Sequence, residues 1–118
     1  MIKGIGIDIV EIERIKEAVE KTGDNFLRRI FTKREINYCK RAKKELKYPE
    51  LAARFAAKEA YAKALGTGIV KLKWCEIEVV KDKRGKPLLA VKGKKLKKAH
   101  LSLSHSRDYA AAAVYLEK

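Results

Sequence analysis

Asp8 is the first residue whose position suggests chemistry. It lies in the alternating stretch 2–10, on the strand face that it shares with Gly4 and Gly6. Because these glycines carry no side chain, another backbone or a ligand can come close to the Asp8 carboxylate. The carboxylate could instead cap the following helix, with Glu11 three residues later. The strand pattern taken alone favours the cap.

Glu59 is the second carboxylate of interest, because the helix expected around it directs it inward. Leu51, Phe55 and Glu59 follow one another at four-residue spacing, and we expect this row to face the core. A buried carboxylate is costly unless it meets a cation, joins a hydrogen-bond network or has a raised pKa. The ordinary interpretation is an ion pair with Lys63, one helical turn further on. A functional role and this ion pair both remain open.

A strand end and a helix that each supply a carboxylate suit Mg²⁺. This ion prefers oxygen ligands, keeps several waters and shares its other positions with substrate phosphates. The helix of Glu59 also carries Arg54, Lys58 and Lys63, and the first two of these cations share one face. Cations beside a metal carboxylate suit a polyphosphate ligand, although each of these lysines taken singly is better explained as a solvated surface charge.

Two further segments give weaker signals. Gly66, Thr67 and Gly68 form a glycine turn that could accept a phosphate, but no Lys-Ser/Thr pair follows, so the turn is not a P-loop. His105 ends an alternating run at a hairpin corner, where an imidazole could meet a phosphate, stack on a base or serve the turn alone. The lysine-rich segment 92–98 is expected to be a solvated face, without a specific role.

The overall composition limits the class of protein. The chain has 118 residues, 29 Lys and Arg against 15 Asp and Glu, and a net charge of +14, so we expect one domain over 1–118 and an anionic partner. Charge alone does not separate nucleic acid, an acidic protein and a phosphorylated small molecule. No apolar stretch reaches membrane-spanning length and no secretory signal is visible, so a cytoplasmic location without membrane contact is expected.

The periodicities predict an α+β fold in which an antiparallel sheet packs against a long helix. A capping box from Thr32 to Glu35, Pro49 in a first helical turn and Gly66 as a stop signal are the clearest local markers. We expect strands at 2–10, 74–80, 88–91, 101–104 and 109–116, and helices from 11 to 22, from 32 into the polar stretch 40–48, and from 49 to 64.

Several motifs together resemble those of the holo-acyl-carrier-protein synthases, a family of 4′-phosphopantetheinyl transferases. The resemblance covers nearly the whole chain, except for the stretch 40–48 and the lysine-rich segment 92–98. The motifs are Gly4-Ile5-Gly6-Ile7-Asp8-Ile9-Val10-Glu11, Arg54-Phe55-Ala56-Ala57-Lys58-Glu59-Ala60 with Lys63, Gly66-Thr67-Gly68, and Ser102-Leu103-Ser104-His105-Ser106.

The resemblance implies a role for each matching residue. Asp8 and Glu59 would be Mg²⁺ ligands and catalytic residues, with Lys63 near the reacting phosphate of coenzyme A. Arg54, Lys63, Gly66, Thr67 and His105 would bind coenzyme A, with Arg54 and His105 at its nucleotide. The family also implies a homotrimer with active sites between neighbouring protomers. The surface for an acidic acyl carrier protein would include Arg14 and Arg28.

The implied reaction moves the phosphopantetheine arm of coenzyme A to a serine of the carrier protein, releases 3′,5′-ADP and serves fatty acid biosynthesis. The serine proton would go to Glu59 or to a metal-bound water, and we favour the water because a carboxylate engaged by Mg²⁺ is a poor base. The competing class is a nucleic-acid-binding module. The charge supports it, as do five aromatic residues that could stack on bases, but no nucleic-acid motif is present. Those residues are Tyr38, Tyr48, Tyr61, Trp74 and Tyr109.

Overall fold

The computed structural model of the chain describes residues 1–41, 45–67 and 72–118. Its helices are α1 (Ile12–Thr22), α2 (Asp24–Ile30), α3 (Lys33–Cys39), α4 (Tyr48–Leu65) and a short 3₁₀ helix (Trp74–Glu76). Its strands are β1 (Ile2–Glu11), β2 (Ile77–Lys81), β3 (Pro87–Val91), β4 (Lys94–Lys95), β5 (Ala99–His105) and β6 (Tyr109–Glu117).

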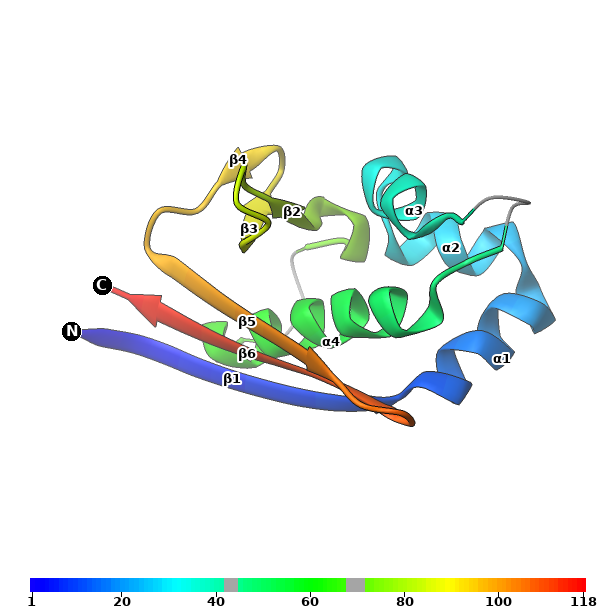
Figure 1. The fold of residues 1–118 in the computed structure, drawn as a ribbon. Coiled ribbons are helices and arrows are strands. Elements are labelled where there is room, and N and C mark those ends of the chain that lie inside the picture. The colour runs from blue at the N-terminus through cyan, green and yellow to red at the C-terminus, as the bar shows by residue number, and fades with distance from the viewer. Residues whose placement is uncertain (42–44, 68–71) are drawn as a thin grey trace.

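The strands form two antiparallel sheets, in the orders β1-β6-β5 and β2-β3-β4. Helix α4 runs along the first sheet, while α1 to α3 gather at the end of the molecule opposite to the two termini (Figure 1). The predicted α+β class is confirmed, although the sheet is divided in two. The strand expected at 74–80 begins only at Ile77, because the three residues before it form the 3₁₀ helix.

The local signals in the sequence account for the helix boundaries. Thr32 and Glu35 form both halves of the predicted capping box at the start of α3. Pro49 lies in the first turn of α4, where a missing N–H is tolerated. Gly66 ends α4 in the left-handed region at φ 79°, a conformation that glycine adopts without strain.

Helix α4 and strand β1 lie in unusually close contact. A Cβ added at Gly6 would overlap the carbonyl oxygen of Ala60, and one added at Gly4 would overlap that of Ala64. Backbone therefore packs directly on backbone along the face of β1 that also carries Asp8. The close approach predicted at these glycines is confirmed, and its occupant is α4.

Helix α4 is buried on nearly all sides. Between Leu51 and Ala64, every residue is buried except Phe55, Glu59 and Lys63. The expectation that the row of Leu51, Phe55 and Glu59 faces the core is therefore wrong beyond its first member, because this row becomes the accessible side of the helix. Within the described ranges, no helix combines the length and the apolar composition needed to cross a membrane.

A buried ion pair joins α4 to the smaller helices. Lys58 and Glu35 have fully buried side chains, and the Lys58 Nζ lies 2.6 Å from the Glu35 Oε1. The same ammonium donates to the carbonyl oxygens of Ile30 at 2.6 Å and Trp74 at 3.2 Å, so all three of its hydrogens have acceptors. Glu35 also accepts hydrogen bonds from the backbone N–H groups of Thr32 at 3.0 Å and Val79 at 2.9 Å.

We predict that Lys58→Met destabilises the chain strongly. The substitution leaves the Glu35 carboxylate buried without a cation, which typically costs about 3–5 kcal/mol. Urea unfolding measures the loss of unfolding free energy. The control is Arg28→Ala, which breaks the exposed pair with Asp24 and should have no measurable effect. Equal stability of the two variants would show that the buried pair does not hold the helices together.

Candidate active site

Asp8 and Lys63 meet between β1 and α4. The Lys63 Nζ donates to the Asp8 Oδ1 at 3.0 Å and to the carbonyl oxygen of Ile7 at 3.0 Å. The N-cap of α1 is Glu11, which makes no side-chain capping bond, so the interpretation of Asp8 as a helix cap is wrong. The Asp8 carboxylate is instead free to face α4, with Lys63 as its cation.

Glu59 is half-buried beside this pair. Its pKa is raised, first because burial disfavours the charged carboxylate and second because of the negative charge of Asp8, while Lys63 acts in the opposite direction. The two carboxylates are thus close enough to repel each other. Lys63 bonds to Asp8, so the ion pair with Glu59 that the sequence left open is not the one that forms.

The carboxylates fit a divalent cation that is bound partly by its substrate. Among the residues that the structure describes, no three His, Cys, Asp or Glu side chains gather as a complete metal site. Asp8 and Glu59 could supply hard oxygen ligands, and the pKa of Glu59 is raised by its burial and then by the charge of Asp8. Mg²⁺ suits such a site because it commonly keeps waters and substrate phosphates in its remaining positions.

Arg54 and Lys58 do not lie on the accessible side of α4. Both are buried, so the explanation of Lys58 as a solvated surface charge is wrong, and Arg54 is not an open cation in the single chain. The Arg54 guanidinium donates to the carboxylate of Glu50 at 3.3 Å and to its carbonyl oxygen at 3.2 Å, while its Nε is buried without a partner. His105 lies 3.6 Å from the same Glu50 carboxylate. Arg54 and His105 therefore meet at the Glu50 carboxylate, and neither of them contacts Lys63.

Three cations surround the ring of Tyr38 in this region. The Arg54 guanidinium carbon lies 4.3 Å from the ring centroid, the Lys81 Nζ 4.9 Å and the Lys47 Nζ 5.3 Å. These distances allow cation–π attraction, and the cluster concentrates positive charge near His105. Sequence reasoning missed Lys47 and Lys81, because they come from different elements and no local pattern links them.

The predicted glycine turn follows directly after the last turn of α4, which carries Lys63. Gly66 follows Lys63 by three residues, and its N–H donates to the Lys63 carbonyl oxygen at 3.1 Å. Thr67 is exposed next to it. Gly68, the last member of the predicted motif, lies outside the described residues. Gly66 and Thr67 thus extend from the helical turn that carries Lys63.

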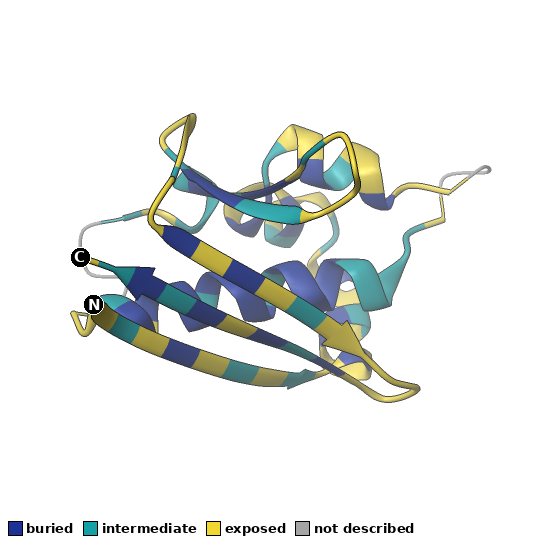
Figure 2. Ribbon diagram, turned by 60° about the vertical axis from the view of Figure 1, so that its left-hand side comes forward, coloured by how far each residue is buried: buried dark blue, intermediate teal, exposed yellow. Residues whose placement is uncertain are grey.

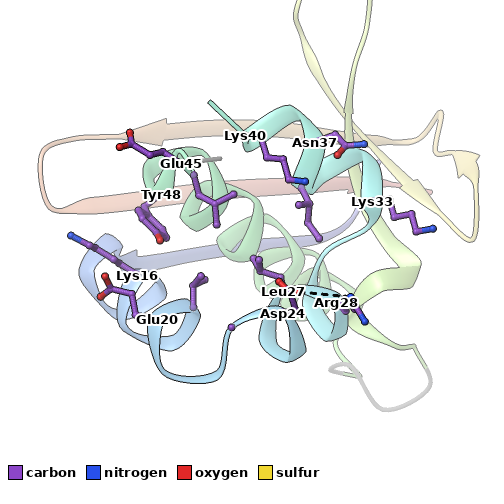
Figure 3. Close-up of a pocket in the computed structure, with 14 residues that line it drawn as sticks. Lys16, Glu20, Asp24, Leu27, Arg28, Lys33, Asn37, Lys40, Glu45 and Tyr48 are labelled. Carbon is purple, nitrogen blue, oxygen red and sulfur yellow. Dashed lines mark ion pairs between the residues drawn. The ribbon is translucent and has the colours of Figure 1, made fainter. Parts of the chain in front are cut away.

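A cavity of about 1010 Å³ opens among α1, α2, α3 and the residues before α4 (Figure 3). Its lining includes Arg28, whose guanidinium lies 3.7 Å from the Asp24 carboxylate, but none of the residues near Asp8. Arg14 is exposed on α1. The two expected carrier-protein contacts therefore belong to the helical end of the molecule.

The open face of the first sheet is apolar. Ile5, Ile7 and Ile9 on β1 remain 64%, 67% and 65% exposed, and Ala111 and Ala113 face two of them from β6. Figure 2 shows the alternation of exposed and buried residues along these strands. Exposed isoleucines in one row are unusual for an isolated chain and mark a contact surface.

The aromatic residues proposed for base stacking do not form one platform. Tyr61 is buried in the core, and Trp74 stacks on Phe55. Tyr38 and Tyr109 are exposed, but they lie on α3 and at the start of β6. A stacking surface for single-stranded nucleic acid is therefore not present among the described residues.

Comparison with known proteins identifies a single family. Residues 4–114 match the family model of the 4′-phosphopantetheinyl transferase superfamily. A holo-acyl-carrier-protein synthase from Halothermothrix orenii is 48% identical, over 100% of this chain and 99% of that protein. The crystal structure of the Bacillus anthracis holo-acyl-carrier-protein synthase in complex with CoA (3′,5′-ADP) has 44% identity and a TM-score of 0.80, covering 98% of this chain and 96% of that one. The Neisseria meningitidis synthase has 38% identity and a TM-score of 0.86, with both chains fully covered.

Proposed function

We propose that this chain, which belongs to the 4′-phosphopantetheinyl transferase superfamily, transfers the phosphopantetheine arm of coenzyme A to a serine of an apo acyl carrier protein. It is an enzyme of the holo-acyl-carrier-protein synthase type, since relatives of that name match it over 97–99% of their length. The modified carrier would then serve fatty acid biosynthesis in the cytoplasm. Two free cysteines, Cys39 and Cys75, are consistent with a reducing compartment.

The observation that carries this proposal is the convergence of Asp8, Glu59 and Lys63. Two carboxylates and an ammonium meet on an accessible edge between β1 and α4. Asp8 and Glu59 would hold Mg²⁺, which when bound would neutralise the pyrophosphate of coenzyme A and the charge that develops on it. Lys63 would stabilise the oxygens of the phosphoryl group that is transferred.

The bond changes follow from the chemistry of coenzyme A. The serine oxygen of the carrier attacks the β-phosphorus, which carries the pantetheine arm. The bond from this phosphorus to the bridging oxygen breaks, and that oxygen leaves with 3′,5′-ADP. The serine proton goes to a base close to the serine. We favour a nearby water as this base, because Glu59, as a ligand of the cation, would be a poor base.

The nucleotide of coenzyme A would lie at the cationic cluster of Arg54, His105, Lys47 and Lys81. The arrangement of three cations around Tyr38 supports this placement, as does the shared contact of Arg54 and His105 with Glu50. Phosphate groups are typical ligands of such clusters. Gly66 and Thr67 would add contacts at the pyrophosphate, since they extend from the turn that carries Lys63.

An acidic carrier protein would dock on the helical end of the molecule. Arg14 on α1 and Arg28 on α2 are exposed there, and the chain as a whole carries a charge of +14. The pair of Arg28 with Asp24 is highly exposed and therefore weak, so it leaves Arg28 available to a carboxylate of the carrier. Such charge complementarity speeds association and orients the partner.

The active form would be a homotrimer with its sites between neighbouring protomers. The apolar open face of the first sheet supports self-association, because burial of Ile5, Ile7 and Ile9 against a second copy would remove them from water. The number three rests on the resemblance to the family. A neighbouring chain could then bring its own His105 cluster toward the carboxylates of this chain.

Intact mass of an apo acyl carrier protein, after incubation with this protein, coenzyme A and Mg²⁺, tests the transfer. We predict a gain of one phosphopantetheine, which disappears with Asp8→Ala and with a chelator, because both remove the cation from the pyrophosphate. The control Glu20→Ala removes an exposed carboxylate of α1 and should keep the gain. A wild-type protein that modifies no carrier would overturn the proposed function.

Ile7→Glu tests the assembly. Ile7 is exposed in the single chain, so the substitution should leave each protomer folded but place a charge inside the contact. We predict that light scattering after gel filtration gives three times the chain mass of 13.4 kDa for the wild type and for a control, Asn37→Glu, at an exposed position of α3. For Ile7→Glu it should give only the single mass. An unchanged mass for Ile7→Glu would exclude the open sheet face as the contact.

A further inference from the structure

The lysine-rich segment 92–98, for which the sequence predicted only a solvated face, borders a hollow of about 500 Å³. Small-molecule sites in proteins typically measure roughly 300–1,000 Å³. The hollow lies at the end of the molecule that carries both termini, opposite to the helical end (Figure 1). Its lining comes from the last turns of α4, from β4 and the start of β5, and from the ends of β1 and β6 that lie beside them. The proposed reaction uses none of these residues.

The base of the hollow is apolar. It consists of buried and half-buried side chains of Tyr61, Leu65, Leu96, Ala99 and Leu116. Leu116 pairs across the sheet with Ala99 on one side and with Gly4 on the other. Because the Gly4 position faces α4, these side chains lie on the covered face of the sheet. The hollow is therefore on the opposite face from Ile5 and from the contact surface of the proposed trimer.

Six exposed lysines surround this apolar base. They are Lys3, Lys94, Lys95, Lys97, Lys98 and Lys118. In the part of the chain that the structure describes, none of the six forms an ion pair with an Asp or Glu side chain. Glu117, the one acidic residue among the described lining residues, lies 2.7 Å from the imidazole of His100. The positive charge at the edge is thus available to an anion from solution.

The hollow is separate from the carboxylates of the candidate active site. Tyr61 follows Glu59 by two residues, and this spacing turns the side chain by about 200° around the helix axis. Leu65 follows Lys63 by the same spacing. The two apolar residues therefore leave α4 on the side away from Asp8, and a ligand in the hollow would contact neither carboxylate.

We propose that this hollow is a second binding site, which takes an aliphatic carboxylate such as a fatty acid. The ammonium groups at the edge would attract the carboxylate, and the apolar base would remove the hydrocarbon chain from water. A nucleic acid would engage the lysines but leave the apolar base empty. A neutral apolar molecule would leave the lysines without an anion. The site does not depend on the proposed transfer reaction.

Calorimetric titration with linear carboxylates tests the site. We expect one molecule bound per chain, with an affinity that rises by up to about fourfold for each CH₂ group added between butanoate and decanoate. Decyltrimethylammonium, which has the same chain length as decanoate but the opposite charge, should not bind. Saturating coenzyme A with Mg²⁺ should not displace decanoate, because the two would occupy different sides of α4.

The double variant Lys95→Glu with Lys97→Glu reverses two charges at the edge and should weaken decanoate binding at least tenfold. The matched control, Lys83→Glu with Lys86→Glu, makes the same change in net charge at exposed positions between β2 and β3 and should keep the wild-type affinity. Equal weakening by both double variants would overturn the site, as would displacement of decanoate by coenzyme A or an affinity that is independent of chain length. None of these measurements requires turnover, so their failure is distinct from failure of the proposed function.

Discussion

Gly4 and Gly6 let the backbone of α4 lie directly on β1, and the positions of the site residues follow from this contact. Any side chain at Gly6 would overlap a carbonyl of the helix and push it away from the strand. With the helix in place, Asp8 meets Lys63 at 3.0 Å and lies near Glu59, whose pKa is raised by burial and then by the Asp8 charge.

Two neighbouring charges on α4 then take different roles. Lys58 is buried and joins α2, α3 and the 3₁₀ helix through Glu35, Ile30 and Trp74. Glu59 is half-buried and faces Asp8. Burial lowers the pKa of Lys58, an effect that the Glu35 carboxylate opposes by favouring the charged ammonium. The buried hydrogen bonds of Lys58 thus hold α4 in place, directly beside the accessible carboxylate of Glu59. Such support is useful if Glu59 and Asp8, which come from separate elements, are to hold one cation.

Local signals were sufficient to predict most elements, because capping, proline and glycine preferences act within a few residues. The box of Thr32 and Glu35 was found in this way, but its link to Lys58 spans 23 residues and leaves no local pattern. The predicted inward orientation of Glu59 was wrong. An alanine-rich helix that is buried on nearly all sides has no polar face, so its sequence does not indicate which side is accessible. The prediction of Asp8 as a metal ligand came from the resemblance, whereas its strand pattern alone favoured a cap.

The central claim is that Asp8 and Glu59 hold one divalent cation together with the pyrophosphate of coenzyme A. Electron paramagnetic resonance of Mn²⁺, used as a probe in place of Mg²⁺, measures this directly by titration with and without coenzyme A. We expect coenzyme A to increase Mn²⁺ affinity in the wild type, and Glu59→Gln, which keeps the shape of the side chain, to abolish the increase. Mn²⁺ binding that is indifferent to coenzyme A or to this substitution would contradict the account.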